Sequence, residues 1–356
     1  MMVRRLGLAL AFLLGLTSLA AAQQPPATSA PAPPPAAEPQ YPVVRVGMLS
    51  YLQYGAELEN HDGQNAFDVT RTYLNINAQV SPSIRFRFTP DVKRVNDGSM
   101  SGSLMVRVKY AFAQFDHALN ERSWVRFGLH QSPWLDFEES VNRYRVQGTV
   151  FPEREGLIPG SADFGASYFT PLPNDYGEIH AGVYNGEGYT QTDPNRYKSV
   201  QGRLTLRPLP KPARTHGLRL SLFYNAGWYD ANRPRRLGIL MASYEHPHLV
   251  ATAETLRATD RPLATMTRDI RRNGWSMFVE PRQGAAGLAA ILRYERFDPD
   301  ATIAAGAHQR AIAGGAYWFI WPRARVGLVA TNERVSYDDA ARPNEDRFLF
   351  QTHIEF

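Results

Sequence analysis

A period-two alternation of apolar and polar residues recurs in short segments along most of this chain. In "TRTYLNINAQV", Leu74 and Ile76 fall on one side of an extended chain, and Asn75 and Asn77 fall on the other. The closing segment "DRFLFQTHIEF" repeats the pattern and ends on the aromatic Phe356. Such alternation is typical of β-strands that have one apolar and one polar face. The sequence therefore predicts an all-β fold.

The N-terminal segment has the layout of a signal for export. Two arginines at positions 4 and 5 precede an apolar stretch over 6–19, and three small residues follow at 20–22. A basic region, an apolar region and a small-residue cleavage site are the three parts of a cleaved secretory signal peptide. We expect residues 1–22 to be that peptide.

The next segment, 23–40, reads "QPPATSAPAPPPAAEPQ" after its first glutamine and shows no apolar periodicity. Such Pro/Ala-rich sequences form semi-extended linkers. The composition is uniform from 41 to 356, which predicts a single domain. The chain contains no cysteine, so disulfides cannot stabilise the exported protein. The domain must rely on packing or on a closed hydrogen-bonded sheet.

The choice between a soluble sandwich and a membrane barrel depends on more than alternation, because both show it. No window after residue 22 holds about 18 consecutive apolar residues, so a membrane-spanning form must be a closed β-barrel. Arginines opposite aromatic residues, and the aromatic chain end, favour the barrel. We count about sixteen candidate strands, which leaves room for strands of about 9–11 residues. The prediction is a transmembrane antiparallel β-barrel of about sixteen strands.

The connections alternate in character, as in a barrel with short periplasmic turns and longer extracellular loops. Tight turns are predicted at "SPS" and at the "PR" after "YWFIW". Long loops are predicted at "GAELENHDGQNAF", "KRVNDGSMSGS" and "NGEGYTQTDPNRYKS". Aromatic residues near strand ends are expected to form girdles at the lipid–water interface: Tyr51, Tyr54, Tyr168, Phe169, Trp228, Tyr229, Trp318 and Trp321.

Several stretches resemble one known family. "GVYNGEGY", "GRLTLRP", "LRYERFDPD", "GAYWFIWPRARVGL" and "RFLFQTHIEF" resemble segments of the phosphate-selective porin O and P family of Gram-negative outer membranes. The resemblance implies a sixteen-stranded, usually trimeric outer-membrane porin that passes small solutes. It also implies contact with outer-membrane lipid and lipopolysaccharide. Phe356 resembles the terminal aromatic that the barrel-assembly machinery recognises.

Other stretches depart from the family pattern, in which "GQxKxPF" precedes "PxRDxG". The first becomes "GLHQSPW", with His130 and Gln131 in place of the glutamine–lysine rhythm. The second becomes "PGSADFG", which keeps Asp163 and lacks the arginine before it. A general or organic-anion porin without phosphate specificity therefore stays open beside a phosphate-preferring one.

A channel selects ions by fixed charges along a water-filled lumen. Arginine suits an anion path, because it is always charged and its planar fork binds oxyanions in pairs of hydrogen bonds. The alternative is that such cations lie at the rims, bind lipid A phosphates or pair with acids. By strand parity, eleven cations are candidates for the pore wall, where they would bind small anions such as phosphate: Arg71, Arg85, Arg87, Arg107, Lys109, Arg126, Arg203, Arg207, Arg219, Arg293 and Arg325.

The segment 133–162 is too long for a turn, and long irregular segments in compact domains are usually functional. We expect it to fold into the barrel and narrow it; a surface loop on the extracellular rim is the alternative. Its charged and aromatic members are Trp134, Asp136, Glu138, Glu139, Arg143, Arg145, Glu153 and Arg154.

Enzyme motifs are missing from the sequence: there is no GxSxG, HExxH or Walker loop. His246 and His248 form a pair too small for a metal-site prediction, and Ser243 is the one position at which a lipid-cleaving serine is conceivable. Removal of residues 1–22 takes away Arg4 and Arg5 and no acid, so the formal net charge falls from +5 to +3, which is too balanced to indicate nucleic acid. We therefore expect no catalysis, cofactor, metal or nucleic-acid partner. An outer-membrane enzyme and an adhesive barrel are the alternatives from other classes.

Overall fold

The computed structural model describes residues 40–356 except for 60–62, 96–97, 212–213 and 304. These residues form one compact unit. The predicted signal peptide, 1–22, and the predicted linker, 23–40, lie outside the described residues apart from Gln40. None of the described helices is long and apolar enough to cross a membrane.

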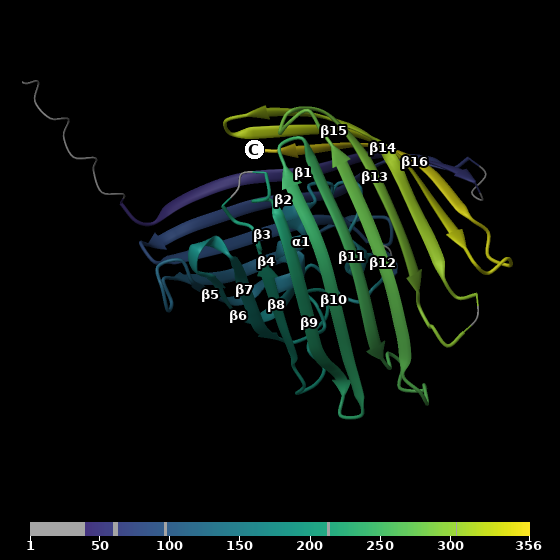
Figure 1. Cartoon of the computed structure of the whole chain (residues 1–356), viewed down its shortest axis with the longest axis horizontal. Coiled ribbons are helices and arrows are strands. Elements are labelled where there is room, and N and C mark those ends of the chain that lie inside the picture. The colour runs from purple at the N-terminus through teal and green to yellow at the C-terminus, as the bar shows by residue number, and fades with distance from the viewer. Residues whose placement is uncertain (1–39, 60–62, 96–97, 212–213, 304) are drawn as a thin grey trace, which may run out of the picture. The chain divides into compact units, whose positions relative to one another are not determined.

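Sixteen strands account for most of the described chain (Figure 1). Short helices occur in the connections: α1 (Pro133–Val141), α2 (Phe151–Arg154), and the 3-10 turns η1 (Gly98–Met100) and η2 (Pro173–Asp175). The strands are β1 (Val43–Glu59), β2 (Asn65–Ser81), β3 (Ile84–Arg94), β4 (Leu104–Asp116), β5 (Trp124–Gln131), β6 (Ala162–Pro171), β7 (Gly177–Tyr184), β8 (Ser199–Leu206), β9 (Leu218–Asp230), β10 (Arg233–His246), β11 (Leu249–Asp260), β12 (Ile270–Pro281), β13 (Gly287–Asp298), β14 (His308–Trp321), β15 (Ala324–Tyr337) and β16 (Glu345–Glu355).

Each strand pairs antiparallel with the next one, and β16 pairs with β1, so the sheet closes into a barrel. At the seam, the backbone N–H groups of Met48 and Phe356 each donate to the other residue's carbonyl, at 2.8 and 3.1 Å. Gly47 allows this close approach, because a Cβ there would lie 2.8 Å from the Phe356 carbonyl oxygen. The predicted sixteen-stranded antiparallel barrel is confirmed.

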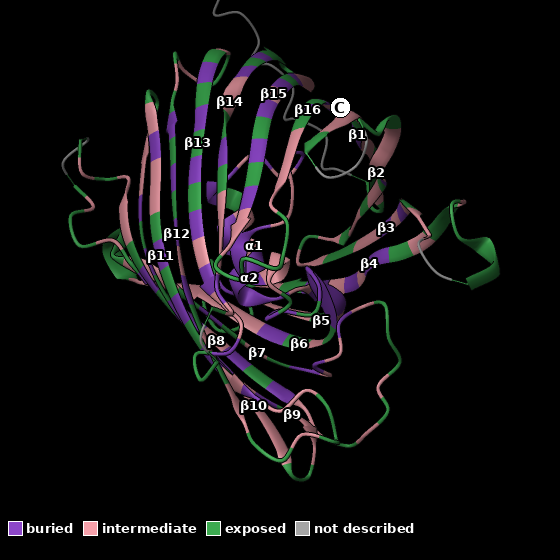
Figure 2. Cartoon of the chain, turned by 90° about the vertical axis from the view of Figure 1, so that its right-hand side faces the viewer, coloured by how far each residue is buried: buried purple, intermediate pink, exposed green. Residues whose placement is uncertain are grey.

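The two faces of the wall follow the sequence alternation (Figure 2). On β16, Phe348 and Phe350 are exposed on the outside, whereas Leu349, Gln351 and His353 are buried inside. Inward residues are buried because other side chains fill the lumen. The outer face is an apolar band, as expected of a wall that faces lipid.

Short turns lie on the side of the barrel where the chain ends, and most longer connections lie on the other side. The tight turns at 82–83 and 322–323 are where the sequence predicts them. Two connections differ from the pattern: 207–217 is long on the short-turn side, and 231–232 is short on the long-loop side.

The prediction of a long loop at "GAELENHDGQNAF" is wrong, because β1 extends to Glu59 and β2 begins at Asn65. Backbone pairing continues past the apolar part of these strands, since a ladder in water needs no apolar face to form its hydrogen bonds.

The girdle prediction is wrong for four aromatic residues that face inward: Tyr51, Phe169, Tyr229 and Trp318. The Tyr229 hydroxyl donates to the buried Asp260 carboxylate at 2.9 Å. Tyr51 and Trp318 are buried in the lumen, with their rings 5.2 Å from that of His353. Phe169 stacks on inward Trp124 at 5.0 Å. By contrast, Trp228 and Trp321 are exposed. Strand-end position alone does not determine which face a residue occupies, because that depends on its register.

Candidate functional site: the barrel interior

The connection between β5 and β6 folds into the barrel, and Figure 2 shows α1 and α2 inside the ring of strands. Ser132 caps α1 by accepting a hydrogen bond from the Leu135 N–H at 3.5 Å, and Pro133 occupies the first turn, where no N–H is needed. Arg203 on β8 donates to the Pro133 carbonyl at 2.9 Å. Residues 132–161 are called the inner loop below.

Apolar contacts attach the inner loop to the wall. Trp134 is fully buried, and its ring lies 5.7 Å from that of Phe223 on β9. Tyr144 packs on Phe278 of β12 and Trp318 of β14, at 6.1 and 5.9 Å between ring centroids. These residues belong to one buried cluster that joins the inner loop to β9–β15. The interior on this side is packed like a protein core.

Polar contacts reinforce the same attachment. Arg143 donates to Glu280 of β12 at 2.7 Å, and Arg154 donates to Glu295 of β13 at 2.7 Å. Both glutamates are almost fully buried. A buried carboxylate is costly unless it is paired, so these contacts hold the inner loop against β12 and β13. Gln147 adds a 2.9 Å hydrogen bond to Glu333 on β15.

The other charged residues of the inner loop are also paired. Asp136 lies 3.2 Å from Arg126 of β5. Arg145 forms ion pairs with Glu139 and Glu153, at 3.1 and 2.6 Å. Burial would lower the pKa of the Arg145 guanidinium, yet the two carboxylates hold that pKa well above its usual value. The mixed charges of this loop therefore largely neutralise one another.

Glu138 is a buried carboxyl group at the contact between α1 and the wall. It accepts a hydrogen bond from the Trp134 indole N–H at 2.7 Å. Burial raises the pKa of Glu138 to about 7, and the charges of Glu295 and Glu139 act in the same direction, against Arg293. The Glu254 carboxyl of β11 lies within hydrogen-bonding reach of it.

The eleven predicted cations all lie on the inward parity. Nine lie on strands, in register with inward residues such as Tyr51 opposite Arg71 and Phe223 opposite Arg203. Lys109 is the extra residue of a bulge in β4 and is buried, and Arg207 directly follows β8. Eight of the eleven have a carboxylate partner. The pairs are Arg85–Asp116, Arg107–Asp91, Arg126–Asp136, Arg203–Glu178, Arg207–Asp175, Arg219–Glu245, Arg293–Glu295 and Arg325–Glu355.

Three cations on β2–β4 have no carboxylate within ion-pair distance among the described residues: Arg71, Arg87 and Lys109. Arg71 lies over the Tyr73 ring at 5.1 Å, and Arg87 over the Tyr110 ring at 4.5 Å. Arg87 also donates to Asn75 at 2.9 Å. Both arginines keep part of their surface accessible. Lys109 is fully buried, with its ammonium 3.9 Å from the Tyr189 ring centre and bonded to the Ser161 hydroxyl.

The sequence analysis missed the tyrosines that hold these cations and the wall glutamates that hold the inner loop. Tyr73 and Tyr110 lie 6.3 Å apart across β2–β4, and Tyr189 comes from the connection after β7. An alternation of Tyr with Arg or Lys on one inward face was a usable signal for the tyrosines. Nothing in the local sequence marks which glutamates meet a loop from a distant part of the chain.

The candidate residues for an enzyme or metal site are not arranged as such a site requires. Over the described ranges, no group of three or more His, Cys, Asp or Glu side chains is placed to hold a metal ion. His246 and His248 have rings 5.6 Å apart. Ser243 is buried on the inward face, opposite Arg219 and Thr252, and not on the lipid-facing wall where a lipid-cleaving serine would need to lie.

No protein-family model and no curated protein matches the sequence. Solved structures do match. An anion-selective porin from Comamonas acidovorans has a TM-score of 0.64 and 13% identity, over 88% of this chain and 99% of that one. OmpT, an outer-membrane protein of Vibrio cholerae, has a TM-score of 0.60 and 11% identity, over 90% and 99%. OprB of Pseudomonas putida at high pH has a TM-score of 0.59 and 9% identity, over 88% and 94%.

Identities this low establish shared architecture and not shared selectivity. The overlap extends over nearly the whole length of each of these proteins, so it concerns the complete barrel. The chain therefore has the closed sixteen-stranded fold of these outer-membrane proteins, an anion-selective porin among them.

Proposed function

We propose that this protein is a passive outer-membrane channel that prefers small anions. The observation that carries the proposal is the unpaired state of Arg71 and Arg87 on the inner wall of β2 and β3, where neither has a carboxylate partner among the described residues. An unpaired guanidinium in a narrow lumen lowers the entry barrier for anions and raises it for cations. The paired arginines elsewhere contribute little net field.

Close packing around Arg71 and Arg87 supports a second element of the proposal, which is selection of solutes by size. Tyr73 and Tyr110 are buried beside the two arginines, so neighbouring side chains pack closely against this part of the wall. A solute that passes here meets guanidinium forks and phenol rings together. Phosphate is one anion that such a fork binds well, and a general or organic-anion channel is the alternative.

The setting follows from the same proposal. Residues 1–22 direct export and are removed, 23–40 form a tether, and 41–356 form the barrel. Short turns face the periplasm, long loops face outward, and Phe356 at the seam is the signal for the barrel-assembly machinery. The barrel works as a homotrimer among outer-membrane lipids, without a cofactor or a catalytic step.

The test is the reversal potential of the refolded protein in a planar bilayer under a potassium chloride gradient. Discrete conductance steps with an anion-selective potential are expected. Steps without selectivity would leave a general porin. Folded protein that gives no steps would contradict the channel itself and favour an adhesive barrel or an enzyme.

A competition experiment addresses phosphate. A phosphate-preferring channel shows chloride current that falls as phosphate is titrated, with saturation at low millimolar concentration or below. If phosphate lowers the chloride current no more than sulfate does at an equal concentration of anionic charge, the result supports the general anion channel.

A further inference from the structure

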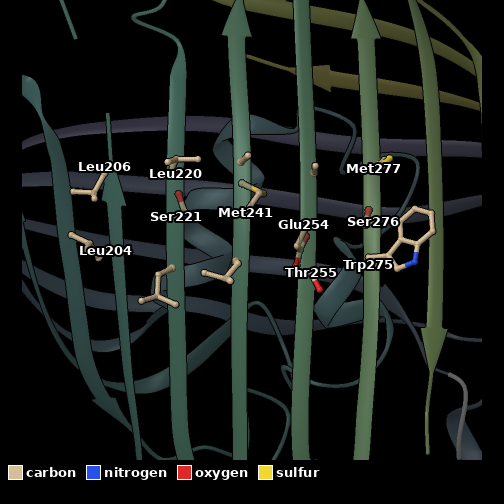
Figure 3. A pocket seen from close by; sticks show the side chains of 14 residues that line it. Leu204, Leu206, Leu220, Ser221, Met241, Glu254, Thr255, Trp275, Ser276 and Met277 are labelled. Carbon is tan, nitrogen blue, oxygen red and sulfur yellow. The ribbon is translucent and has the colours of Figure 1, made fainter. Parts of the chain in front are cut away.

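The outer wall across β8–β12 is hollowed into a groove (Figure 3). Its apolar part has a volume of about 660 Å³ and runs over five adjacent strands. Outward side chains of two successive rows form it: Leu204, Leu222, Leu240, Thr255 and Trp275 in one row, and Leu206, Leu220, Ala242, Ala253 and Met277 in the next.

The groove continues toward the long loops and becomes polar there. A second hollow of about 390 Å³ shares Thr255 and Trp275 with the apolar part and extends to Arg257 and Arg271. Trp275 lies at the junction, with its ring 5.4 Å from that of Tyr294 on β13. Aromatic rings with a polar edge are typical of the level where lipid headgroups meet acyl chains.

Three arginines converge at this polar end. Arg236, Arg257 and Arg271 are exposed on β10, β11 and β12, and their chain neighbours Leu237, Leu256 and Arg272 face inward. Arg236 pairs with Thr259, and Thr259 pairs with Arg271, while Arg257 lies one outward row nearer the apolar part. Diagonal neighbours of this kind are about 7–8 Å apart at Cα.

Within the described part of the chain, none of these three arginines forms an ion pair. By register, the nearest outward carboxylate is Asp298, which lies opposite Asn273. The other acids nearby are already paired: Asp269 with Arg261, Asp300 with Arg268, and Asp260 with Arg272. The rim end of the groove therefore carries a net positive charge beside an apolar surface.

We propose that this groove binds a phosphate-bearing lipid of the outer leaflet, with acyl chains along the leucine rows and phosphate at Arg236, Arg257 and Arg271. Charge complementarity supports this occupant, because a neutral lipid leaves three adjacent guanidinium groups without a counter-charge. The order along the strands fits as well: the charged end lies toward the long loops, and the apolar rows run away from them toward the short-turn side. The inference goes beyond the channel proposal, since binding on the outer wall does not require conduction.

Native mass spectrometry of the refolded protein in detergent, titrated with lipid A, tests the site. The variant Arg236→Gln/Arg257→Gln/Arg271→Gln is expected to bind lipid A about tenfold more weakly or worse. The control Arg122→Gln/Arg214→Gln/Arg323→Gln removes the same charge from exposed positions on the short-turn side. It is expected to bind lipid A as the unchanged protein does. Heat-dependent migration on gels verifies that all three proteins are folded barrels.

Two further arms identify the ligand. Dephosphorylated lipid A is expected to bind the unchanged protein no more tightly than lipid A binds the triple variant. Inorganic phosphate at 10-fold molar excess over lipid A is expected to leave the lipid adduct intact; displacement would mean a site for free anions and would contradict the proposal. Lipid A binding by the triple variant as tight as that by the unchanged protein would also contradict the proposal. If lipid binding were unchanged and the triple variant shifted from trimer to monomer, the face would be assigned to contact with a second copy of the chain.

Discussion

The two halves of the inner wall differ in what they do with their charges. On β10–β15, apolar side chains such as Leu237, Ile239 and Phe278 pack against the inner loop, and the buried Glu280 and Glu295 are paired to its arginines. On β2–β4, Arg71 and Arg87 face inward beside tyrosines and have no carboxylate partner among the described residues.

Inward charges of one barrel therefore serve two purposes. Charges that meet the inner loop are neutralised and fix its position, so they act on the shape of the lumen. Arg71 and Arg87 on the opposite wall keep their field, unlike the paired Arg85 and Arg107 beside them, so these two act on the ions that pass. The same residue type, arginine, has either role according to whether a carboxylate lies within reach.

The largest expected effect comes from Trp134→Ala, which removes the fully buried indole that joins α1 to β9. Loss of a buried Trp costs about 3–5 kcal/mol, and here that loss weakens the docking of the inner loop against the wall. Trypsin cleavage within 132–161 is expected to rise more than a hundredfold, and single-channel conductance to increase. An unchanged cleavage rate in a folded barrel would show that the inner loop does not depend on this core.

Glu138 gives the attachment a pH dependence. Its pKa is raised from an ordinary 4.5 to about 7 in the docked loop, so docking holds a proton that the undocked loop releases. Docking therefore weakens as pH rises from about 4.5 to about 7, by up to about 3 kcal/mol, and is constant above that window. The facing charges are Arg293, Glu295, Glu139 and Glu254.

Cleavage of the inner loop measured from pH 4.5 to 8 checks this expectation. Glu138→Gln is expected to flatten the profile, and Glu121→Gln, an exposed change in the turn after β4, to leave it intact. A rising profile that persists in Glu138→Gln would assign the titration to another group.

Arg143→Gln has a smaller expected effect. It removes the donor to Glu280 and to the Ala285 carbonyl, and the guanidinium 4.5 Å from the Trp318 ring, while Arg282 still pairs with Glu280. A hydrogen bond to a charged group is worth about 1.5–3 kcal/mol, so cleavage at Arg145 and Arg154 should rise about tenfold to a hundredfold.

The exposed Arg196→Gln serves as its control, since Arg196 has no carboxylate partner in the described ranges and lies beside Tyr197. If both variants were cleaved at the same rate, the Arg143–Glu280 contact would not hold the inner loop.

The smallest effect is expected from removing an exposed inward pair as a unit. Arg85 and Asp116 are paired at the short-turn end, with the Arg85 side chain half exposed. Exposed ion pairs contribute about 0–1 kcal/mol, and Arg85→Gln/Asp116→Asn leaves the net charge unchanged. Stability and reversal potential should both stay within error. A clear change in the reversal potential would show that paired charges also influence selectivity.

Much of this architecture could be predicted from the sequence, because alternation fixes strands and faces directly. The face assignment of β16 followed from "DRFLFQTHIEF", and the number of strands from repeated alternation. The span of the inner loop was also readable, since no strand pattern interrupts it. The inward parity of the eleven cations followed from the same alternation.

The pairing of those cations could not be predicted, because it depends on contacts between distant segments. Arg143 meets a glutamate 137 residues away, and Arg154 one 141 residues away. Strand β10 carried a hint: "GILMA" is apolar on both faces, which is typical of a strand covered on both sides. One side is the outer surface and the other is the inner loop. A strand whose inward face is apolar therefore indicates where such a loop packs against the wall.

The central claim is that the unpaired arginines on β2 and β3 set the ion preference. The most direct test is the reversal potential of Arg71→Gln/Arg87→Gln under a potassium chloride gradient, beside the unchanged protein and Arg85→Gln/Asp116→Asn. We expect the potential of the Arg71/Arg87 variant to move from the anion-selective side to zero or beyond, while the paired control keeps its value. An unchanged anion preference in the Arg71/Arg87 variant, with conductance intact, would contradict the account.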